Sequence, residues 1–143
     1  MRFFNKFLAL LVMIMFCGSA FAVDNTYTAY NIGQALGKVS HKSFKAMDQE
    51  LRKKDFIAGF DNTILNQKPD VNKVSDKDSY EVGMIIAAQY KSKLKKMITI
   101  NEENSKSFVE GFNKAADAKE VELSTQDKQI LKHFKIYNED EDN

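Results

Sequence analysis

The chain has 143 residues, of which 43% are apolar and 29% are charged, and its formal net charge is +1. This length and composition fit one small globular domain, and the near-zero charge argues against a nucleic acid as the main partner. The single cysteine, Cys17, stands in an N-terminal leader, which excludes a disulfide framework and thiol chemistry from the rest of the chain.

Residues 1–22 have the pattern of a secretory signal peptide. Arg2 and Lys6 precede an apolar run, and Ala-Phe-Ala at 20–22 is a small-x-small cleavage site. The apolar run is shorter than the about 20 residues that span a bilayer, which disfavours a membrane anchor. The bulky residues before Cys17 disfavour lipid attachment. We therefore predict a protein exported to the periplasm, with secretion or lipid anchoring as alternatives.

Apolar residues after the leader recur at a period near 3.6, which predicts an all-α fold of about five helices. The predicted helices run from Asn25 to about Leu51 with a bend near Ser40, from Phe56 to before Pro69, from Ser75 to about Met97, from Asn101 to Ala116, and from Ser124 to Tyr137. Asn25 is a good N-cap residue, and two later starts resemble a capping box, formed by Ser75 with Asp78 and by Ser124 with Asp127.

Three motifs occur twice, in the same order and at a nearly constant offset. YNIGQALG at 30–37 matches YEVGMIIA at 80–87, FIAGF at 56–60 matches FVEGF at 108–112, and VSDKD at 74–78 matches LSTQD at 123–127. The recurrence indicates a tandem duplication of a helical hairpin. The predicted repeats are residues 23–72 and 73–137, followed by an acidic, disordered tail at 138–143.

Glycines inside the predicted helices mark the candidate packing surface. Each costs a helix roughly 1 kcal/mol relative to alanine, so their recurrence at one offset favours a packing role. Two small residues four apart clear a stripe of the helix, which a partner helix or an aromatic ring can approach closely. The predicted helix-packing or interface residues are Tyr30, Gly33, Gly37, Phe56, Gly59, Phe60, Tyr80, Gly83, Ala87, Phe108, Gly111 and Phe112.

The sequence shows no pattern for catalytic, cofactor-binding or metal-binding residues, and we predict none. His41 and His133 are the only histidines, and neither has a second ligand at metal spacing. A Gly-x-Ser-x-Gly motif and a glycine-rich phosphate loop are absent. Asp61 has no evident partner, and the basic segment at 91–97 is interpreted as a helix end that suits the helix dipole.

Each repeat reads Tyr-x-[Ile/Val]-Gly-x-x-[Leu/Ile], then Phe-x-x-Gly-Phe, then [Leu/Val]-Ser-x-x-Asp. This order resembles the amino-terminal helical domain of exported bacterial FKBP-type peptidyl-prolyl isomerases, the macrophage infectivity potentiator class, over most of residues 25–137. The resemblance implies a domain that dimerises by intertwining helices and binds unfolded clients. In that family the isomerase reaction belongs to a separate β-sheet domain. We do not expect that domain here, because the last predicted helix runs almost to the end and tryptophan, which floors the family's pocket, is absent.

The resemblance implies an exported, non-catalytic accessory module for protein folding, either chaperone-like or a dimerisation and docking domain. Its implied partners are unfolded or partly folded envelope proteins, or another envelope folding factor. Nucleic acid and, after leader cleavage, the membrane interior are not expected as partners. The resemblance further implies that the two helical hairpins are intertwined, either within one chain as a pseudo-dimeric monomer or between two chains as a homodimer. An assembly or host-interaction protein without chaperone activity is the alternative, and peptidyl-prolyl cis-trans isomerase activity is less favoured.

Overall fold

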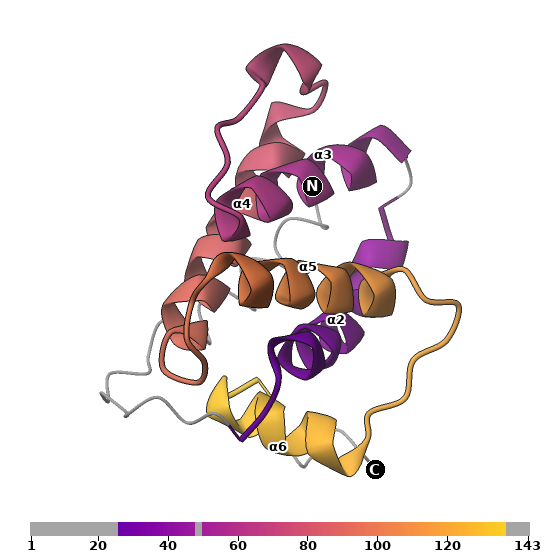
Figure 1. The fold of residues 1–143 in the computed structure, drawn as a ribbon. Coiled ribbons are helices and arrows are strands. Elements are labelled where there is room, and N and C mark those ends of the chain that lie inside the picture. Colours follow the sequence, from indigo (N-terminus) through magenta and orange to yellow (C-terminus); the bar gives the residue numbers. More distant parts are fainter. Residues whose placement is uncertain (1–25, 48–49, 137–143) are drawn as a thin grey trace.

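The computed structural model describes residues 26–47 and 50–136, so the predicted leader and acidic tail lie outside the described residues. These two ranges hold five α-helices, one short 3-10 helix and no strand, which confirms the all-α prediction for this part of the chain (Figure 1). The elements are α2 (Ala29–Lys45), α3 (Glu50–Ile64), η1 (Val71–Lys73), α4 (Lys77–Leu94), α5 (Glu102–Ala116) and α6 (Thr125–His133).

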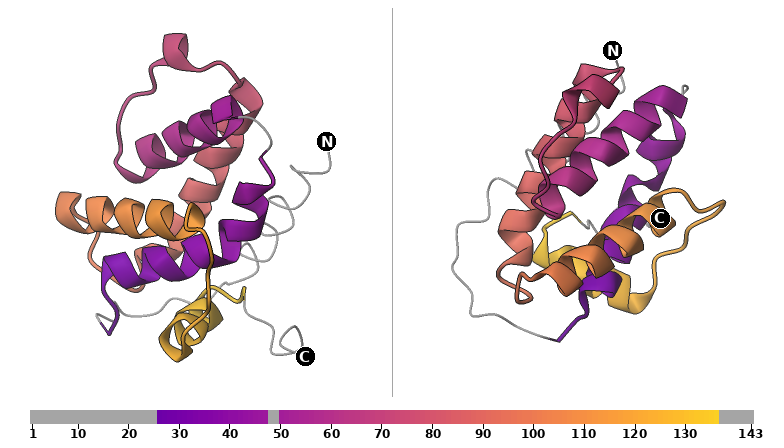
Figure 2. Two further views of the ribbon diagram at one scale, coloured as in Figure 1. Left: turned by 90° about the vertical axis from the view of Figure 1, so that its right-hand side faces the viewer. Right: turned by 45° about the horizontal axis from the view of Figure 1, so that its top comes forward.

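The helices pair by exchange between the two predicted repeats. The first helix of one repeat packs along the second helix of the other, so α2 lies along α5 and α4 lies along α3. Helix α3 also touches α5 in the middle of the molecule, and α6 packs on α2 (Figure 2). The contacts therefore run from α6 through α2, α5 and α3 to α4, and the two hairpins are intertwined.

Side chains just before each helix explain where four of the helices begin. Thr28, Asp76 and Asn101 each accept a hydrogen bond from the backbone N–H three residues on, at 3.1, 3.2 and 2.8 Å. Ser124 and Asp127 form a complete capping box at the start of α6. Each such bond satisfies a backbone donor that the first helical turn leaves unpaired. The predicted start at Asn101 and the predicted capping box of α6 agree with these contacts.

The first predicted helix is wrong in its start, its bend and its end. Thr28 rather than Asn25 caps α2. The helix then continues without interruption through Ser40, whose hydroxyl donates to the Leu36 carbonyl at 2.9 Å. It stops at Lys45, so the region around Leu51 belongs to α3. The apolar pattern concealed this boundary because Phe44 and Met47 are both buried, one at the end of α2 and one in the connection.

The predicted cap of the next repeat is wrong by one residue. Asp76, not Ser75, caps α4. The cause is Asp55 of α3, a buried carboxylate that accepts hydrogen bonds from the backbone N–H groups of both Ser75 and Asp76. Ser75 is thus fixed in the loop by a tertiary contact, which local capping preference does not reveal.

The core lies where the two helix pairs meet. Its largest fully buried side chains are Phe44, Phe56, Phe60, Tyr90, Phe108, Phe112 and Phe134. Burying one such ring contributes about 1.5–3 kcal/mol, which makes these rings the main stabilising feature of a domain without disulfides. Helix α3 ends at Ile64, and the chain reverses two residues later at Asn66, whose φ of 56° is a conformation that asparagine tolerates better than most residues.

Candidate functional site

Close approach of main chain to main chain defines the α2–α5 interface. A Cβ atom added at Gly33 would lie less than 3.0 Å from the Phe108 carbonyl oxygen, and one at Gly37 would meet the Phe112 carbonyl oxygen equally closely. The approach is reciprocal, because a Cβ at Gly111 would meet the Tyr30 carbonyl oxygen. The cleared stripe is therefore filled by the partner helix backbone rather than by an aromatic ring.

The α3–α4 interface repeats this arrangement at the corresponding positions. Gly83 lies against the Phe56 carbonyl oxygen and the Phe60 nitrogen, and Gly59 lies against the Tyr80 carbonyl oxygen. Ala87, the counterpart of Gly37, is fully buried. The structure thus brings the twelve predicted interface residues into two equivalent interfaces, in which all except the half-buried Tyr30 are buried.

The rings predicted for the packing surface stack between the two interfaces. Phe60 and Phe112 lie parallel, with their centroids 4.2 Å apart. Phe60 also stacks with Phe56 and with Phe108, each at 6.2 Å. Tyr90 meets Phe60 edge-on at 6.2 Å. Offset and edge-on ring pairs add about 0.5–1.5 kcal/mol each to the burial term, so this stack ties the two helix pairs together.

Two side chains close the carboxyl ends of the paired helices. His41 of α2 lies with Nδ1 3.1 Å from the Ala116 carbonyl oxygen, a contact that requires the proton on Nδ1. Lys91 of α4, at the corresponding position of the other repeat, donates to the Thr63 carbonyl at 3.3 Å. Both groups satisfy carbonyls that have no partner inside their helix. We therefore assign His41 a structural role.

Asp61 gains a partner that the sequence did not reveal. The Asn113 side-chain amide donates to both carboxylate oxygens of Asp61, at 3.1 and 3.3 Å. Burial raises the pKa of Asp61 to about 6, while the Asn113 hydrogen bond acts in the opposite direction. The Asp61–Asn113 contact joins α3 to α5, which also touch each other.

Helix α6 is attached by contacts that the sequence analysis also missed. Lys38 of α2 forms an ion pair with Asp127, whose side chain is only 7% exposed. Burial acts to raise the pKa of Asp127, but hydrogen bonds from Lys38 and Ser124 outweigh it and hold that pKa below its usual value. His133 packs edge-on against Tyr27, with ring centroids 6.0 Å apart. The repeat at Ser124 and Asp127 was visible in the sequence, but the partner Lys38 lies 89 residues away.

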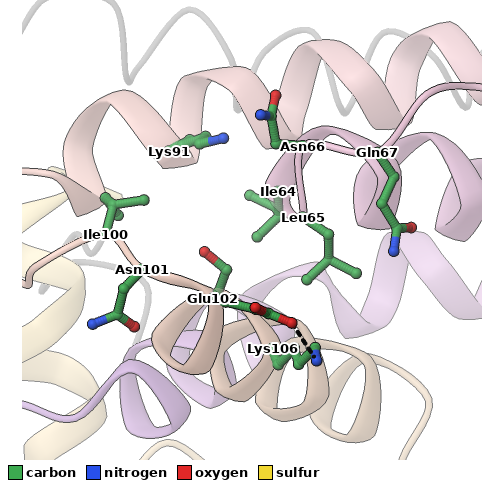
Figure 3. A pocket seen from close by; sticks show the side chains of 10 residues that line it. Ile64, Leu65, Asn66, Gln67, Lys91, Ile100, Asn101, Glu102 and Lys106 are labelled. Carbon is green, nitrogen blue, oxygen red and sulfur yellow. Dashed lines mark hydrogen bonds and ion pairs between the residues drawn. The ribbon is translucent and has the colours of Figure 1, made fainter.

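A shallow cavity of about 370 Å³ lies between the end of α3, helix α4 and the start of α5 (Figure 3). Leu65 and Ile100 provide apolar walls, and Lys91, Glu102 and Lys106 lie around it. Glu102 and Lys106 pair with each other at 2.8 Å, and Lys91 is bound to Thr63, so each charge already has a partner. The cavity therefore offers no aligned acid, base or nucleophile.

The described residues contain no group of three or more histidine, aspartate or glutamate side chains that could hold a metal ion. No helix within the same residues is long and apolar enough to cross a membrane. Within the described residues, the helix interfaces and the two side chains at their carboxyl ends recur in both halves. What the geometry defines is an all-helical domain, built on paired glycine interfaces.

The family comparison agrees with this class. The chain belongs to the family of domains amino terminal to FKBP-type peptidyl-prolyl isomerase, whose model matches residues 25–122. The match contains α2, α3, α4 and α5, and therefore both glycine interfaces, whereas α6 follows it. Neither the curated proteins nor the solved structures provided a match.

Proposed function

We propose that this protein is a non-catalytic accessory module for protein folding that works in the periplasm and binds apolar segments of unfolded or partly folded envelope proteins. Membership of the FKBP amino-terminal family supports a role beside the isomerases. We also propose that the fold arose by tandem duplication. The matching contacts of the two glycine interfaces support this origin. The observation that carries client binding is an apolar patch on α4, formed by Met84 and Ile85.

Comparison of the two repeats explains why this patch stands out. Ile85 corresponds to Ala35 of α2, which is fully buried one turn before Lys38, the residue bound to α6. Helix α6 thus packs on the stripe of α2 that includes Lys38, whereas the equivalent stripe of α4 faces solvent. Met84 and Ile85 are 37% and 43% exposed, and they are the large apolar side chains on the described surface with the highest exposure.

The chemistry of the patch favours a flexible apolar segment as its occupant. Methionine is unbranched and adapts its shape to different partners, a property of surfaces that bind many sequences. The neighbouring exposed residues of the stripe, Glu81 and Ala88, add one charge and one small side chain. Such a surface gives weak, non-selective contacts of the kind that delay aggregation.

The test is suppression of aggregation of a reduced model client by the mature protein. We expect a dose-dependent delay at stoichiometric ratios. The double variant Met84→Ser, Ile85→Ser should lose most of the delay, and Ala88→Ser, on the same exposed stripe, should retain it. No delay with the wild-type protein, together with no capture of an envelope folding factor, would overturn the proposal.

The same preparation distinguishes the other functions. A single tight partner without any effect on unfolded clients would identify an assembly or host-interaction protein. Acceleration of a proline-limited refolding reaction would instead identify an isomerase. Equal delay by the wild-type and the Met84→Ser, Ile85→Ser proteins would show that client binding occurs elsewhere on the molecule.

A further inference from the structure

The two halves of the domain are related by a pseudo-two-fold axis. Exchanging the halves carries Gly33 and Phe108 onto Gly83 and Phe56, and each glycine meets the same backbone atoms of its partner. On a two-fold axis, a residue faces its own equivalent, as in an isologous dimer. Phe60 and Phe112 are such equivalents, and their rings stack at 4.2 Å with 18° between their planes.

The next pair on the axis is not self-complementary. Asp61 and Asn113 directly follow these two phenylalanines, and the Asn113 amide donates to both oxygens of the Asp61 carboxylate. An ionised carboxylate can only accept hydrogen bonds, so it needs a donor opposite. Two carboxylates in this half-buried position would repel each other, and one would be forced to take up a proton.

A second pair on the axis differs in size. Ser40 and Tyr90 occupy corresponding positions of α2 and α4, and both are buried. The Tyr90 ring contacts Phe60, Phe112 and Phe134. Burial raises the pKa of Tyr90, and the neighbouring Ser40 hydroxyl opposes this, although its geometry falls short of a hydrogen bond. Two tyrosines would overfill this space, and two serines would leave it empty.

We propose that these two pairs make the helix exchange heterotypic, so that the first half of the domain (26–64) fits the second half (77–116) and rejects a copy of itself. The preferred partner of each half is thus the other half. Two copies of this chain should not pair first half with first half, or second half with second half. Rejection of the wrong partner by an unpaired charge or a clash is a general route to specificity. The inference does not rest on client binding.

The ionisation of Asp61 makes the Asp61–Asn113 pair measurable through the pH dependence of stability. Asp61 has a raised pKa of about 6, caused by burial, so its charge lowers stability as the pH rises through 6. The charged group that α4 brings nearby, Lys91, is bound to the Thr63 carbonyl, and Glu110 and Lys114 of α5 are exposed. On α3 itself, Lys53 is paired with Asp117. Stability between pH 5 and 8 should therefore report on the Asp61–Asn113 pair.

The test is a four-variant cycle in the full mature chain, with urea unfolding at pH 5 and pH 8. Asn113→Asp places two carboxylates on the axis and should shift the urea midpoint down, more at pH 8 than at pH 5. Asp61→Asn places two amides there and should remove the loss of stability between pH 5 and 8. The double variant Asp61→Asn, Asn113→Asp restores an unlike pair and should recover most of the wild-type midpoint.

Each outcome of the cycle is decisive. If Asn113→Asp is as stable as the wild type at pH 8, or if the double variant is no better than Asn113→Asp, the two positions are not complementary and the proposal is overturned. If Asn113→Asp does not fold at pH 8, two measurements still test the proposal: whether this variant folds at pH 5, and the urea midpoint of the double variant.

Discussion

At the scale of single residues, the five described glycines are needed for close approach and not for unusual backbone angles. Each has a helical conformation, without positive φ, and each faces a backbone atom of the paired helix. A glycine inside a helix costs about 1 kcal/mol of propensity. This cost is offset because glycine has no side chain, so the two paired helices can approach closely and bury surface against each other.

Gly33→Ala tests this reason directly. The helix gains about 1 kcal/mol of propensity, but the new Cβ would lie under 3.0 Å from the Phe108 carbonyl oxygen, which cannot rotate away. Overpacking of this kind costs about 1–3 kcal/mol or more, so we expect a net loss of unfolding free energy in urea titration. Gly83→Ala should behave alike, because it meets the Phe56 carbonyl in the same way.

The control is Ser92→Ala, at an exposed site on α4 where a smaller gain in helix propensity meets no obstacle. It should raise stability by up to about 0.5 kcal/mol. If Gly33→Ala or Gly83→Ala raised stability as this control does, the close contact of the helix backbones would be absent in solution.

At the scale of elements, α6 differs from the four paired helices. It has only nine residues, lies outside the glycine interfaces, and is held to α2 by apolar contacts and the Lys38–Asp127 ion pair. Ile130, Leu131 and Phe134 reach the core, and Phe134 meets Tyr90 edge-on at 6.2 Å. Helix α6 therefore stabilises one side of a nearly symmetric molecule and leaves the other side, on α4, open.

Asp127→Asn should weaken this attachment. It removes the charge that binds Lys38 and weakens the capping box, which together should cost about 1–3 kcal/mol of unfolding free energy at pH 7. The folded pKa of Asp127 lies below 3.8, so the wild type keeps this stabilisation at neutral pH and loses it as the pH falls through that pKa. The difference between wild type and variant should therefore shrink below pH 4.

Asp78→Asn provides the comparison for this prediction. Asp78 is the aligned acid at the start of α4, and it is exposed. Its substitution should change the unfolding free energy by no more than about 0.5 kcal/mol. Equal effects of Asp78→Asn and Asp127→Asn would show that the Lys38 contact adds nothing to the stability of the protein.

Helix identity was readable from the sequence, but helix pairing and exact boundaries were not. The period of apolar residues and the doubled Tyr-x-x-Gly and Phe-x-x-Gly-Phe motifs predicted a duplicated, all-α fold, whereas the intertwining was implied only by the family resemblance. Gly33 and Gly37 indicated which face of α2 is clear, but their spacing does not say which helix lies on it. The cap of α4 depends on Asp55, and the pair of Asp61 depends on Asn113; both are contacts between distant segments without a local signal.

At the scale of the whole molecule, the fold behaves as one unit although its sequence reads as two. Both main helix pairs join a segment before the exposed loop at 66–70 to a segment after it. Neither half can bury its own phenylalanines alone, because Phe60 needs Phe112 and Gly83 needs Phe56 as neighbours. The loop should therefore stabilise the fold by keeping the two halves at a high effective concentration, and not by making contacts of its own.

Cutting the loop tests this arrangement. A specific protease site inserted between Pro69 and Asp70, both exposed, leaves the helices intact. After cleavage we expect the two fragments to elute together, with the mass of one uncut chain and unchanged helical content. Their unfolding midpoint should become dependent on protein concentration, because the two halves then associate as separate molecules. Fragments that separate at micromolar concentration while each keeps its helical content would show that the pairs form within each repeat. A doubled mass before cleavage would show that two copies of the chain associate.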